Sequence, residues 1–270
     1  MFSQVFDDHL FSQKLPVDAK VLDLACGSGV FLVDAFRRLV ARRVSAGEKL
    51  TRTLVRRVLS DQIFGVDVSE TAVEIAAFSL CLTAFELDPS PGSADHLKFR
   101  HSLKGRNLFV EPNAGAFATT GFVDEDPFNK RRFSIVVGNP PWNKPKGARS
   151  NTEATSTSHI EYCKKHDPPI ELPFRSPIDQ AFIWRSRDFL TVSGRIGLIL
   201  DAKNFFSQEK QSLISKRQLF THLRTRAMIN LSVLHNKKLF PTAEQPAMRS
   251  FWNHLQRFGA VFRTSNASVG

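Results

Sequence analysis

The stretch Ser134-Ile135-Val136-Val137-Gly138-Asn139-Pro140-Pro141-Trp142-Asn143 decides the fold that we expect of this chain. Its first half is apolar and β-branched, which is typical of a buried strand. The paired prolines that follow can continue neither a strand nor a helix. We therefore expect Asn139 and Trp142 on a rigid turn at the carboxyl end of a strand, where open α/β sheets bind their ligands.

This turn carries an amide beside an aromatic ring, and the two can hold a flat heterocycle that has an exocyclic amine. The pattern therefore indicates chemistry on a base nitrogen. The alternative is a proline-rich turn whose Trp142 fills the core. That alternative is favoured for a bare Pro-Pro-Trp, and residues upstream change the balance.

The stretch Val21-Leu22-Asp23-Leu24-Ala25-Cys26-Gly27-Ser28-Gly29-Val30-Phe31-Leu32 predicts a second strand-turn-helix unit. Gly27 and Gly29 permit positive φ and a close approach of the backbone to a ligand. After Gly29 the apolar residues recur at helical spacing, at Phe31, Leu32, Ala35, Phe36 and Leu39. The unit is typical of a nucleotide-binding loop at a helix N-terminus.

An acidic residue at the end of the next strand is the candidate for binding ribose. The dinucleotide fingerprint requires an acid about 20 residues beyond its glycines, and none lies there at a strand end. The next strand is Ile63-Phe64-Gly65-Val66-Asp67, and the two carboxylate oxygens of Asp67 suit a diol. The alternative is that Asp67 caps a helix beginning near Ser69.

Two further residues of the glycine loop have interpretations of their own. Asp23 either orients the loop by accepting backbone N–H bonds or contacts the ammonium group of an amino-acid-bearing cofactor. Cys26 is expected to pack within the loop, because no base is patterned with it as a nucleophile would require.

Three motifs in this order resemble those of the N6-adenine DNA methyltransferases, and most closely the large restriction-modification and phage-defence type. The motifs are Asp-Leu-Ala-Cys-Gly-Ser-Gly-Val-Phe-Leu (23–32), Gly-Val-Asp-Val (65–68) and Gly-Asn-Pro-Pro-Trp (138–142). The likeness covers roughly residues 18–260, and residues 179–200 are similar to the helix and strand after that family's catalytic loop.

The resemblance implies an S-adenosylmethionine-dependent, Rossmann-like methyltransferase fold, α/β with a mostly parallel sheet and helices on both faces. It implies S-adenosylmethionine as the methyl donor and double-stranded DNA with a flipped adenine as the partner. The catalytic residues that it implies are Asn139, Pro140, Pro141 and Trp142. The implied cofactor-binding residues are Asp23, Ala25, Cys26, Gly27, Gly29, Phe31, Asp67, Val68, Asn107 and Leu108, and Asn107 is alternatively a turn residue after Gly105.

The chemistry of the implied reaction matches these residue types. The amine of adenine is a poor nucleophile because its lone pair is delocalised, whereas a methyl sulfonium is already activated, so we expect no metal. The side-chain oxygen of Asn139 and the carbonyl of Pro140 can each accept one N–H bond, which frees the lone pair. Trp142 can stack on the base, which helps offset the cost of flipping it out of the duplex. We expect no general base.

Composition narrows the classes of partner. The net charge is +11, which suits a polyanion. The first basic cluster falls in a helical region and consists of Arg37, Arg38, Arg42, Arg43, Lys49, Arg52, Arg56 and Arg57. The second basic cluster flanks the turn at Asn139–Trp142 and consists of Lys130, Arg131, Arg132, Lys144, Lys146 and Arg149. For the first cluster, DNA contact and a solvated helix face are equally favoured. The three cysteines are scattered along the chain, which argues against disulfides and against a structural zinc site. We expect no membrane span and no signal peptide, and we therefore expect the protein in the cytosol.

The elements alternate along the chain, so a parallel sheet is predicted. We expect strands near 20–25, 62–67, 97–101, 133–138, 195–200 and 227–233, and a last one between residues 248 and 262. Helices are expected near 30–44, 48–60, 70–87, 178–191 and 209–222. Residues 1–262 form the predicted catalytic domain, with a mobile insertion at about 143–177 and a tail at 263–270.

The chain also departs from the family pattern. No aromatic-Thr-Pro segment precedes the glycine loop, and nothing after residue 260 can form a target recognition domain. The expectation is a catalytic core that is a fragment, a subunit needing a separate specificity domain or subunit, or a decayed copy. The alternatives are an RNA-base or protein-glutamine N-methyltransferase and a non-catalytic subunit that keeps the fold.

Overall fold

The structure is a computed structural model that describes residues 10–12, 14–90, 102–112, 115–117, 132–142, 152–230 and 247–254. Its centre is a seven-stranded sheet in the order β3-β2-β1-β4-β5-β7-β6. The strands are β1 (Val21–Asp23), β2 (Ile63–Asp67), β3 (Leu108–Val110), β4 (Phe133–Gly138), β5 (Leu190–Asp201), β6 (Leu223–Asn230) and β7 (Ala247–His254). Strands β1 to β5 pair in parallel, and β7 runs antiparallel to both β5 and β6.

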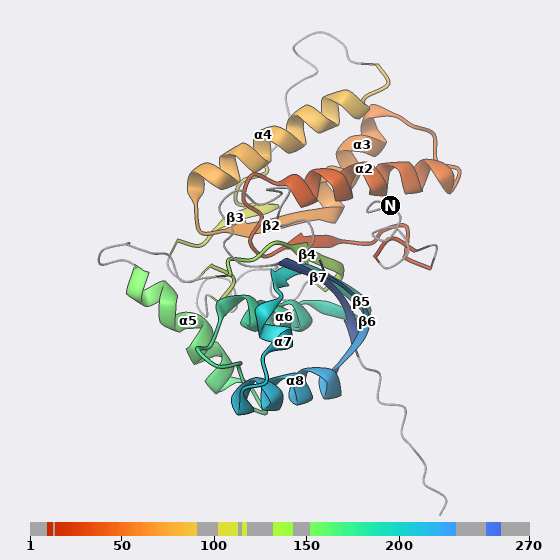
Figure 1. The fold of residues 1–270 in the computed structure, drawn as a ribbon. Coiled ribbons are helices and arrows are strands. Elements are labelled where there is room, and N and C mark those ends of the chain that lie inside the picture. The colour runs from red at the N-terminus through yellow and green to blue at the C-terminus, as the bar shows by residue number, and fades with distance from the viewer. Residues whose placement is uncertain are drawn as a thin grey trace, which may run out of the picture.

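Helices cover both faces of this sheet (Figure 1). One layer holds α2 (Val30–Ser45), α3 (Arg52–Gln62) and α4 (Glu70–Leu87), and the other holds α5 (Thr152–Lys165), α6 (Ile178–Asp188), α7 (Lys203–Phe206) and α8 (Lys210–His222). The short 3-10 helix η2 (Gly115–Phe117) packs with α5 and α6. The predicted fold class, α/β with a mostly parallel sheet and helices on both faces, is confirmed.

Each face of the sheet has its own apolar core. Leu32, Phe36 and Leu39 of α2 are fully buried between that helix and the strands. On the other face Trp252 of β7 and Phe133 of β4 are fully buried against α6 and its neighbours. The strands between the two layers are apolar on both sides, which is why they appear in the sequence as continuous apolar runs.

Local sequence explains where the helices of the first layer begin. The side chain of Thr51 accepts a hydrogen bond from Leu54 N at 3.1 Å and thereby caps α3. Ser69 caps α4 in the same way, with Ala72 N as the donor at 3.2 Å. Helix α2 begins differently, because its N-cap is Gly29 and no side chain caps it. Its first N–H groups are therefore directed toward the glycine loop.

Most of the predicted elements are present among the described residues. The strand expected at 97–101 lies outside the described residues, as does the tail at 263–270. The short strand β3 was not predicted, because three residues carry too little pattern. The insertion predicted at about 143–177 contains α5, a helix that the sequence pattern did not predict. Cys163 of α5, Ile170 and Leu172 are buried in the core, so this part of the insertion packs against the rest of the protein.

Among the helices that the structure describes, none combines the length and the apolar character needed to cross a membrane.

Candidate active site

The glycine loop and Asp67 form one hydrogen-bonded unit at the carboxyl edge of the sheet. Gly27 and Gly29 have φ values of 51° and 84°, which favour glycine. The Oδ2 atom of Asp67 accepts a hydrogen bond from Gly27 N at 2.8 Å, and its Oδ1 atom accepts one from Ser69 N at 2.9 Å. Asp67 thus fixes the glycine loop and also closes the turn before α4, so the helix-capping alternative describes part of what it does.

The surroundings of Gly29, Gly27 and Cys26 in this loop differ. A Cβ atom added to Gly29 would lie 3.0 Å from the Cβ atom of Ala76 in α4, so the loop and the helix touch. At Gly27 an added Cβ atom would meet nothing within 4 Å, which leaves open space above the loop. Cys26 is buried, and burial followed by the charge of Asp23 raises the pKa of its thiol. That pKa fits the predicted packing role of Cys26.

Asp23 connects the glycine loop to the catalytic turn. Its carboxyl is fully buried, and Oδ1 accepts a hydrogen bond from Ala25 N at 3.0 Å. A Cβ atom added to Gly138 would lie only 2.7 Å from that Oδ1 atom, so Gly138 leaves room for the Asp23 carboxyl where the ends of β1 and β4 meet. Burial raises the pKa of Asp23 to about 7, the Ala25 hydrogen bond opposes the rise, and the charge of Asp67 adds to it.

The two oxygens of Asp23 differ in their hydrogen bonding. Among the described residues, Oδ2 of Asp23 is buried and has no hydrogen-bond partner. A buried carboxylate oxygen without a donor is costly. The loop-orienting interpretation of Asp23 accounts for Oδ1 only, and Oδ2 suits a cationic donor such as the ammonium group of the alternative interpretation.

The catalytic turn follows β4 directly, beside the end of β1. The register pairs Asp23 with Val137, so Asn139 leaves the sheet next to the glycine loop. Asn139 is exposed, Pro140 is buried and Pro141 is exposed. Trp142 is half-buried, and its Nε1–H donates to the carbonyl of Ile199 in β5 at 3.2 Å. This hydrogen bond fixes one edge of the indole ring against the sheet.

A cavity of about 900 Å³ lies next to Trp142, which is one of its lining residues. The other lining residues come from the turn before α6, the end of β5, α7 and the start of α8; they are Phe174, Arg175, Ser176, Pro177, Ile178, Asp201, Lys203, Asn204, Phe206, Ser207, Glu209 and Ser212. The sequence analysis did not predict these residues. They lie far from the catalytic turn along the chain, and no motif among them signals a site.

A buried carboxyl organises one wall of this cavity. Asp179 of α6 is fully buried and accepts hydrogen bonds from Asp201 N at 3.1 Å, Asn204 Nδ2 at 3.3 Å and Gln180 Nε2 at 3.3 Å. Burial raises the pKa of Asp179 to about 7, while the hydrogen bonds from Asp201 and Gln180 oppose the rise. Asp201 and Asn204 both line the cavity, so Asp179 sets their positions.

Two residues predicted to contact the cofactor lie elsewhere. Asn107 precedes β3, on the amino side of the sheet, because Leu108 pairs with Gly65 and not with Asp67. Its Nδ2 atom donates to Ser60 O at 2.9 Å and to Ile63 O at 2.8 Å, at the junction of α3 and β2. Leu108 is fully buried in the α2–α4 core. The structure does not bring these two residues to the glycine loop: they stabilise the packing of β3, and the turn alternative for Asn107 is closer to its observed place.

The remaining predicted cofactor residues flank the loop. Phe31 is half-buried in the first turn of α2, and Val68 is 49% exposed just after Asp67. Both are therefore accessible at the edge of the sheet where Gly27 leaves open space.

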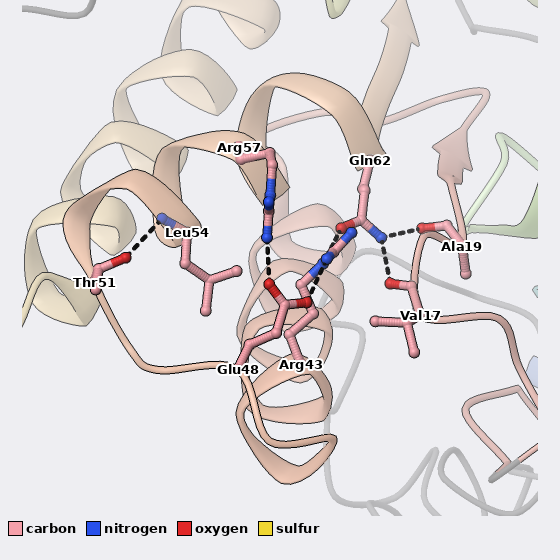
Figure 2. A network of polar contacts seen from close by, with 8 residues as sticks. All are labelled: Val17, Ala19, Arg43, Glu48, Thr51, Leu54, Arg57 and Gln62. Carbon is pink, nitrogen blue, oxygen red and sulfur yellow. Dashed lines mark hydrogen bonds and ion pairs between the residues drawn. The ribbon is translucent and has the colours of Figure 1, made fainter.

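The first basic cluster is largely engaged in ion pairs within the α2–α4 layer, and Figure 2 shows one such group. Arg43 donates to Gln62 Oε1 at 2.9 Å and to Glu48 at 2.6 Å, and Arg57 also pairs with Glu48. Gln62 in turn donates to Ala19 O at 2.7 Å. This network ties α2 and α3 to the segment before β1, which favours the solvated-face alternative for that cluster. Of the second basic cluster only Arg132 is described, and it is exposed.

The sheet order and the glycine loop define the fold class as that of the S-adenosylmethionine-dependent methyltransferases. Residues 61–240 match the family described as Eco57I restriction-modification methylase. The chain belongs to this family, and the resemblance found in its sequence motifs is confirmed.

Comparisons with individual proteins agree with this membership. The adenine-specific methyltransferase PglX of Streptomyces coelicolor is 32% identical over 150 residues, which are 46% of this chain and 12% of PglX. The adenine-specific methyltransferase BrxX of Escherichia coli O9:H4 is 36% identical over 73 residues, 27% of this chain and 6% of BrxX. A similar solved structure is that of the Type ISP restriction-modification enzyme LlaGI in complex with a DNA substrate mimic. Its superposition on this chain has a TM-score of 0.64 at 16% sequence identity, and the match covers 93% of this chain and 22% of the LlaGI chain. The matched regions are thus a small part of each relative.

Proposed function

We propose that this chain is the catalytic core of an adenine-specific DNA methyltransferase, which transfers a methyl group from S-adenosylmethionine to the N6 atom of adenine. The observation that carries the proposal is the junction of Asp23 and Gly138. There the glycine loop after β1 and the Asn139–Trp142 turn after β4 touch at one edge of the sheet. A cofactor held by the first loop and a base held by the second would therefore meet.

The residues at the β1 and β2 ends fit this cofactor. The open space above Gly27 would accept its methionine part, and the N–H groups at the start of α2 lie at the same loop. Asp67 has two bonded oxygens, and a carboxylate has about four acceptor positions, so it can still accept hydrogen bonds from a ribose diol. Asp23 Oδ2 would accept the cofactor's ammonium group. When bound, S-adenosylmethionine supplies a methyl group activated on a sulfonium.

On the base side, Asn139 and Pro140 would act on the amine of adenine. The side-chain oxygen of Asn139 and the backbone carbonyl of Pro140 each accept one N–H bond, which draws the nitrogen toward tetrahedral geometry and frees its lone pair. Both acceptors stabilise the positive charge that develops on that nitrogen. The rigid Pro-Pro turn keeps them in position, so little reorganisation is needed during the reaction. The proton of the product leaves to water.

Trp142 would hold the base once it has left the duplex. Stacking of a base on an aromatic ring is worth about 1–3 kcal/mol, which is comparable to the few kcal/mol that unstacking costs. The hydrogen bond from Trp142 to Ile199 supports this role, because a ring fixed at one edge loses little freedom when the base stacks on it. The cavity beside Trp142 offers space for the nucleotide.

The choice of DNA sequence would come from a separate specificity domain or subunit. BrxX and PglX, which are both adenine-specific methyltransferases, are far longer than the regions that match this chain. LlaGI is a DNA-bound restriction-modification enzyme of which this chain covers 22%. In such an arrangement the chain performs the transfer and another part of the assembly reads the sequence.

The test is transfer of labelled methyl from S-adenosylmethionine to unmethylated duplex DNA, with total RNA and cell protein as parallel substrates. We expect label on DNA alone. Label on RNA or protein alone would refute the DNA assignment, and no label on any substrate with cofactor binding intact would favour a non-catalytic subunit or a core that needs its specificity partner.

Cofactor binding is tested by Gly27→Ala with Gly47→Ala as the matched control. Both glycines have positive φ, and a Cβ atom would meet nothing within 4 Å at either. Alanine is strained at both positions, and more so at Gly47 with its φ of 97° than at Gly27 with its φ of 51°, but only the Gly27 methyl enters the proposed site. Calorimetric titration should show S-adenosylmethionine affinity lowered at least about tenfold by Gly27→Ala, the equivalent of about 1.4 kcal/mol, and unchanged by Gly47→Ala.

A further inference from the structure

The turn before α6 contains two adjacent residues in a strained conformation. Arg175 and Ser176 have φ values of 70° and 48°, in the left-handed region that residues other than glycine rarely adopt. Such strain persists only where the surrounding structure imposes it, and it is concentrated at functional sites. The turn therefore holds its side chains in positions that a relaxed loop would not give them.

Three hydrogen bonds impose this conformation. Ser176 N donates to Pro173 O at 2.9 Å, which closes the turn. The buried ring of His159 in α5 bonds to Ser176 O through Nε2 at 3.0 Å. Phe174 N donates to Ser212 Oγ in α8 at 3.4 Å. The turn is thus anchored to two helices, and it is a rigid part of the cavity wall.

The side chains that this turn presents are an aromatic ring and a cation. Phe174 is 55% exposed, although burying a phenyl ring is favourable, and the guanidinium of Arg175 lies 5.5 Å from its ring centroid. Both residues line the cavity together with Trp142, Lys203 and Phe206, and Phe206 is 57% exposed. Exposed rings interleaved with cations are the combination that binds single-stranded nucleic acid, by base stacking and phosphate contact.

The size of the cavity exceeds what the flipped adenine requires. A site of about 900 Å³ accommodates a drug-sized molecule, which has several times as many atoms as one purine base. Trp142, one of the lining residues, accounts for one base. Phe174 and Arg175 are left without a function in the transfer reaction itself.

We propose that Phe174 and Arg175 form a second nucleotide subsite, which binds the base and the phosphate next to the adenine that stacks beside Trp142. This inference rests on the proposed function. Phe174 stacks on the neighbouring base, and the Arg175 guanidinium contacts the phosphate that joins the two nucleotides. The flipped adenine would thereby be held through its strand as well as through its base.

The experiment measures binding of a fluorescein-labelled single strand of about ten nucleotides, which is within the site sizes of single-strand binders. The strand is all thymine except for one central adenine. Anisotropy titrations of the full chain are run at salt concentrations from about 50 to 200 mM, the range over which phosphate contacts are revealed. Two further probes lack the base on one or the other side of the adenine. The variants are Phe174→Ala and Arg175→Gln, and the controls are Phe220→Ala and Arg217→Gln, whose residues are exposed on α8 and do not line the cavity.

We expect Phe174→Ala to weaken binding at least about fivefold, the lower end of the effect of losing one stacked base. One of the abasic probes should bind wild type correspondingly more weakly, and Phe174→Ala should lose nothing further with that probe. Arg175→Gln should reduce the slope of log affinity against log salt by about 0.7, the value for one phosphate contact on a single strand. The controls should match wild type.

Variants that match their controls in affinity and salt slope would overturn the subsite, and so would a wild-type chain that binds none of the probes. Methyl transfer is measured separately. A wild-type chain that binds the probes with these variant effects but transfers no methyl group would leave the subsite standing and would count only against methyl transfer by this chain alone.

Discussion

Asp23 and Asp179 are two fully buried carboxyls, one on each side of β4, and burial raises the pKa of both to about 7. Their surroundings differ. Asp179 accepts hydrogen bonds from Asp201, Asn204 and Gln180, whereas Asp23 accepts one from Ala25, and its Oδ2 has no partner among the described residues. The chain itself thus supplies the donors that satisfy Asp179 beside the cavity, whereas Asp23 keeps an oxygen without a donor among the described residues, which supports the proposed cofactor site.

The largest expected effect concerns stability. Asp179→Ala leaves two buried donors, Asp201 N and Gln180 Nε2, and the half-buried amide of Asn204 without their acceptor, and each unsatisfied buried group costs about 1–3 kcal/mol. We expect the free energy of unfolding to fall by about 3 kcal/mol or more. Asp23→Ala removes one such bond and should cost about 1–3 kcal/mol. Urea denaturation of the two variants measures both values, and equal losses would remove the distinction between the two carboxyls.

The second effect concerns cofactor affinity. Asp23→Asn keeps an acceptor for Ala25 but removes the charge that would face the ammonium group of S-adenosylmethionine. A hydrogen bond to a charged group is worth about 1.5–3 kcal/mol, so we expect the dissociation constant to rise about tenfold to a hundredfold. Asp179→Asn should leave it within about twofold. Calorimetric titration of both variants decides the matter, and an unchanged affinity in Asp23→Asn would return Asp23 to a purely loop-orienting role.

The pH dependence of binding sharpens the same comparison. With a pKa of about 7, Asp23 is protonated below neutral pH in the free protein, and binding of an ammonium group requires the ionised form. Affinity for S-adenosylmethionine should therefore fall as the pH drops below about 7, by at most about tenfold per pH unit. The dependence should be lost in Asp23→Asn and retained in Asp179→Asn. A flat profile in the wild type between about pH 5.5 and 7.5 would mean that Asp23 does not face the cofactor's charge.

The sequence predicted the cofactor side far better than the base side. Continuous apolar runs ending in Asp23, Asp67 and Asn139 predicted strands β1, β2 and β4, because a buried parallel strand leaves that signature in the sequence itself. The sequence could not show that Asn107 lies at the amino end of β3, since register alone decides which end of that strand reaches the edge of the glycine loop.

The base cavity could not be predicted in the same way. Phe174, Arg175 and Lys203 come together only through the packing of the turn before α6 against α7 and α8. The left-handed conformation of Arg175 and Ser176 is imposed by His159 and Ser212, which are distant in sequence, and not by a glycine that would have marked the turn. A polar segment at 151–158 also gave no sign of the helix that buries Cys163.

The smallest expected effect concerns the paired arginines of the first layer. Arg37 is bonded to both carboxylate oxygens of Glu86, and Arg57 is paired with Glu48. Because the charges of Arg37 and Arg57 are locally compensated, the double variant Arg37→Gln, Arg57→Gln should bind a single-stranded oligonucleotide with an affinity within about twofold of the wild type. Its stability should also change little, since exposed ion pairs of this kind contribute little to the free energy of unfolding. A loss as large as that of Arg175→Gln would show that DNA also contacts the α2–α4 layer.

The central claim is that Asn139 accepts a hydrogen bond from the amine of adenine during methyl transfer. The most direct measurement is mass spectrometry of nucleosides from duplex DNA incubated with S-adenosylmethionine and either the wild-type chain or Asn139→Ala, with cofactor affinity measured for both. We predict N6-methyladenine from the wild type and a loss of about a hundredfold or more in Asn139→Ala, typical of removing one preorganised polar group from a transition state, with cofactor affinity unchanged. Methylcytosine as the product, or N6-methyladenine formed equally well by Asn139→Ala, would contradict the account.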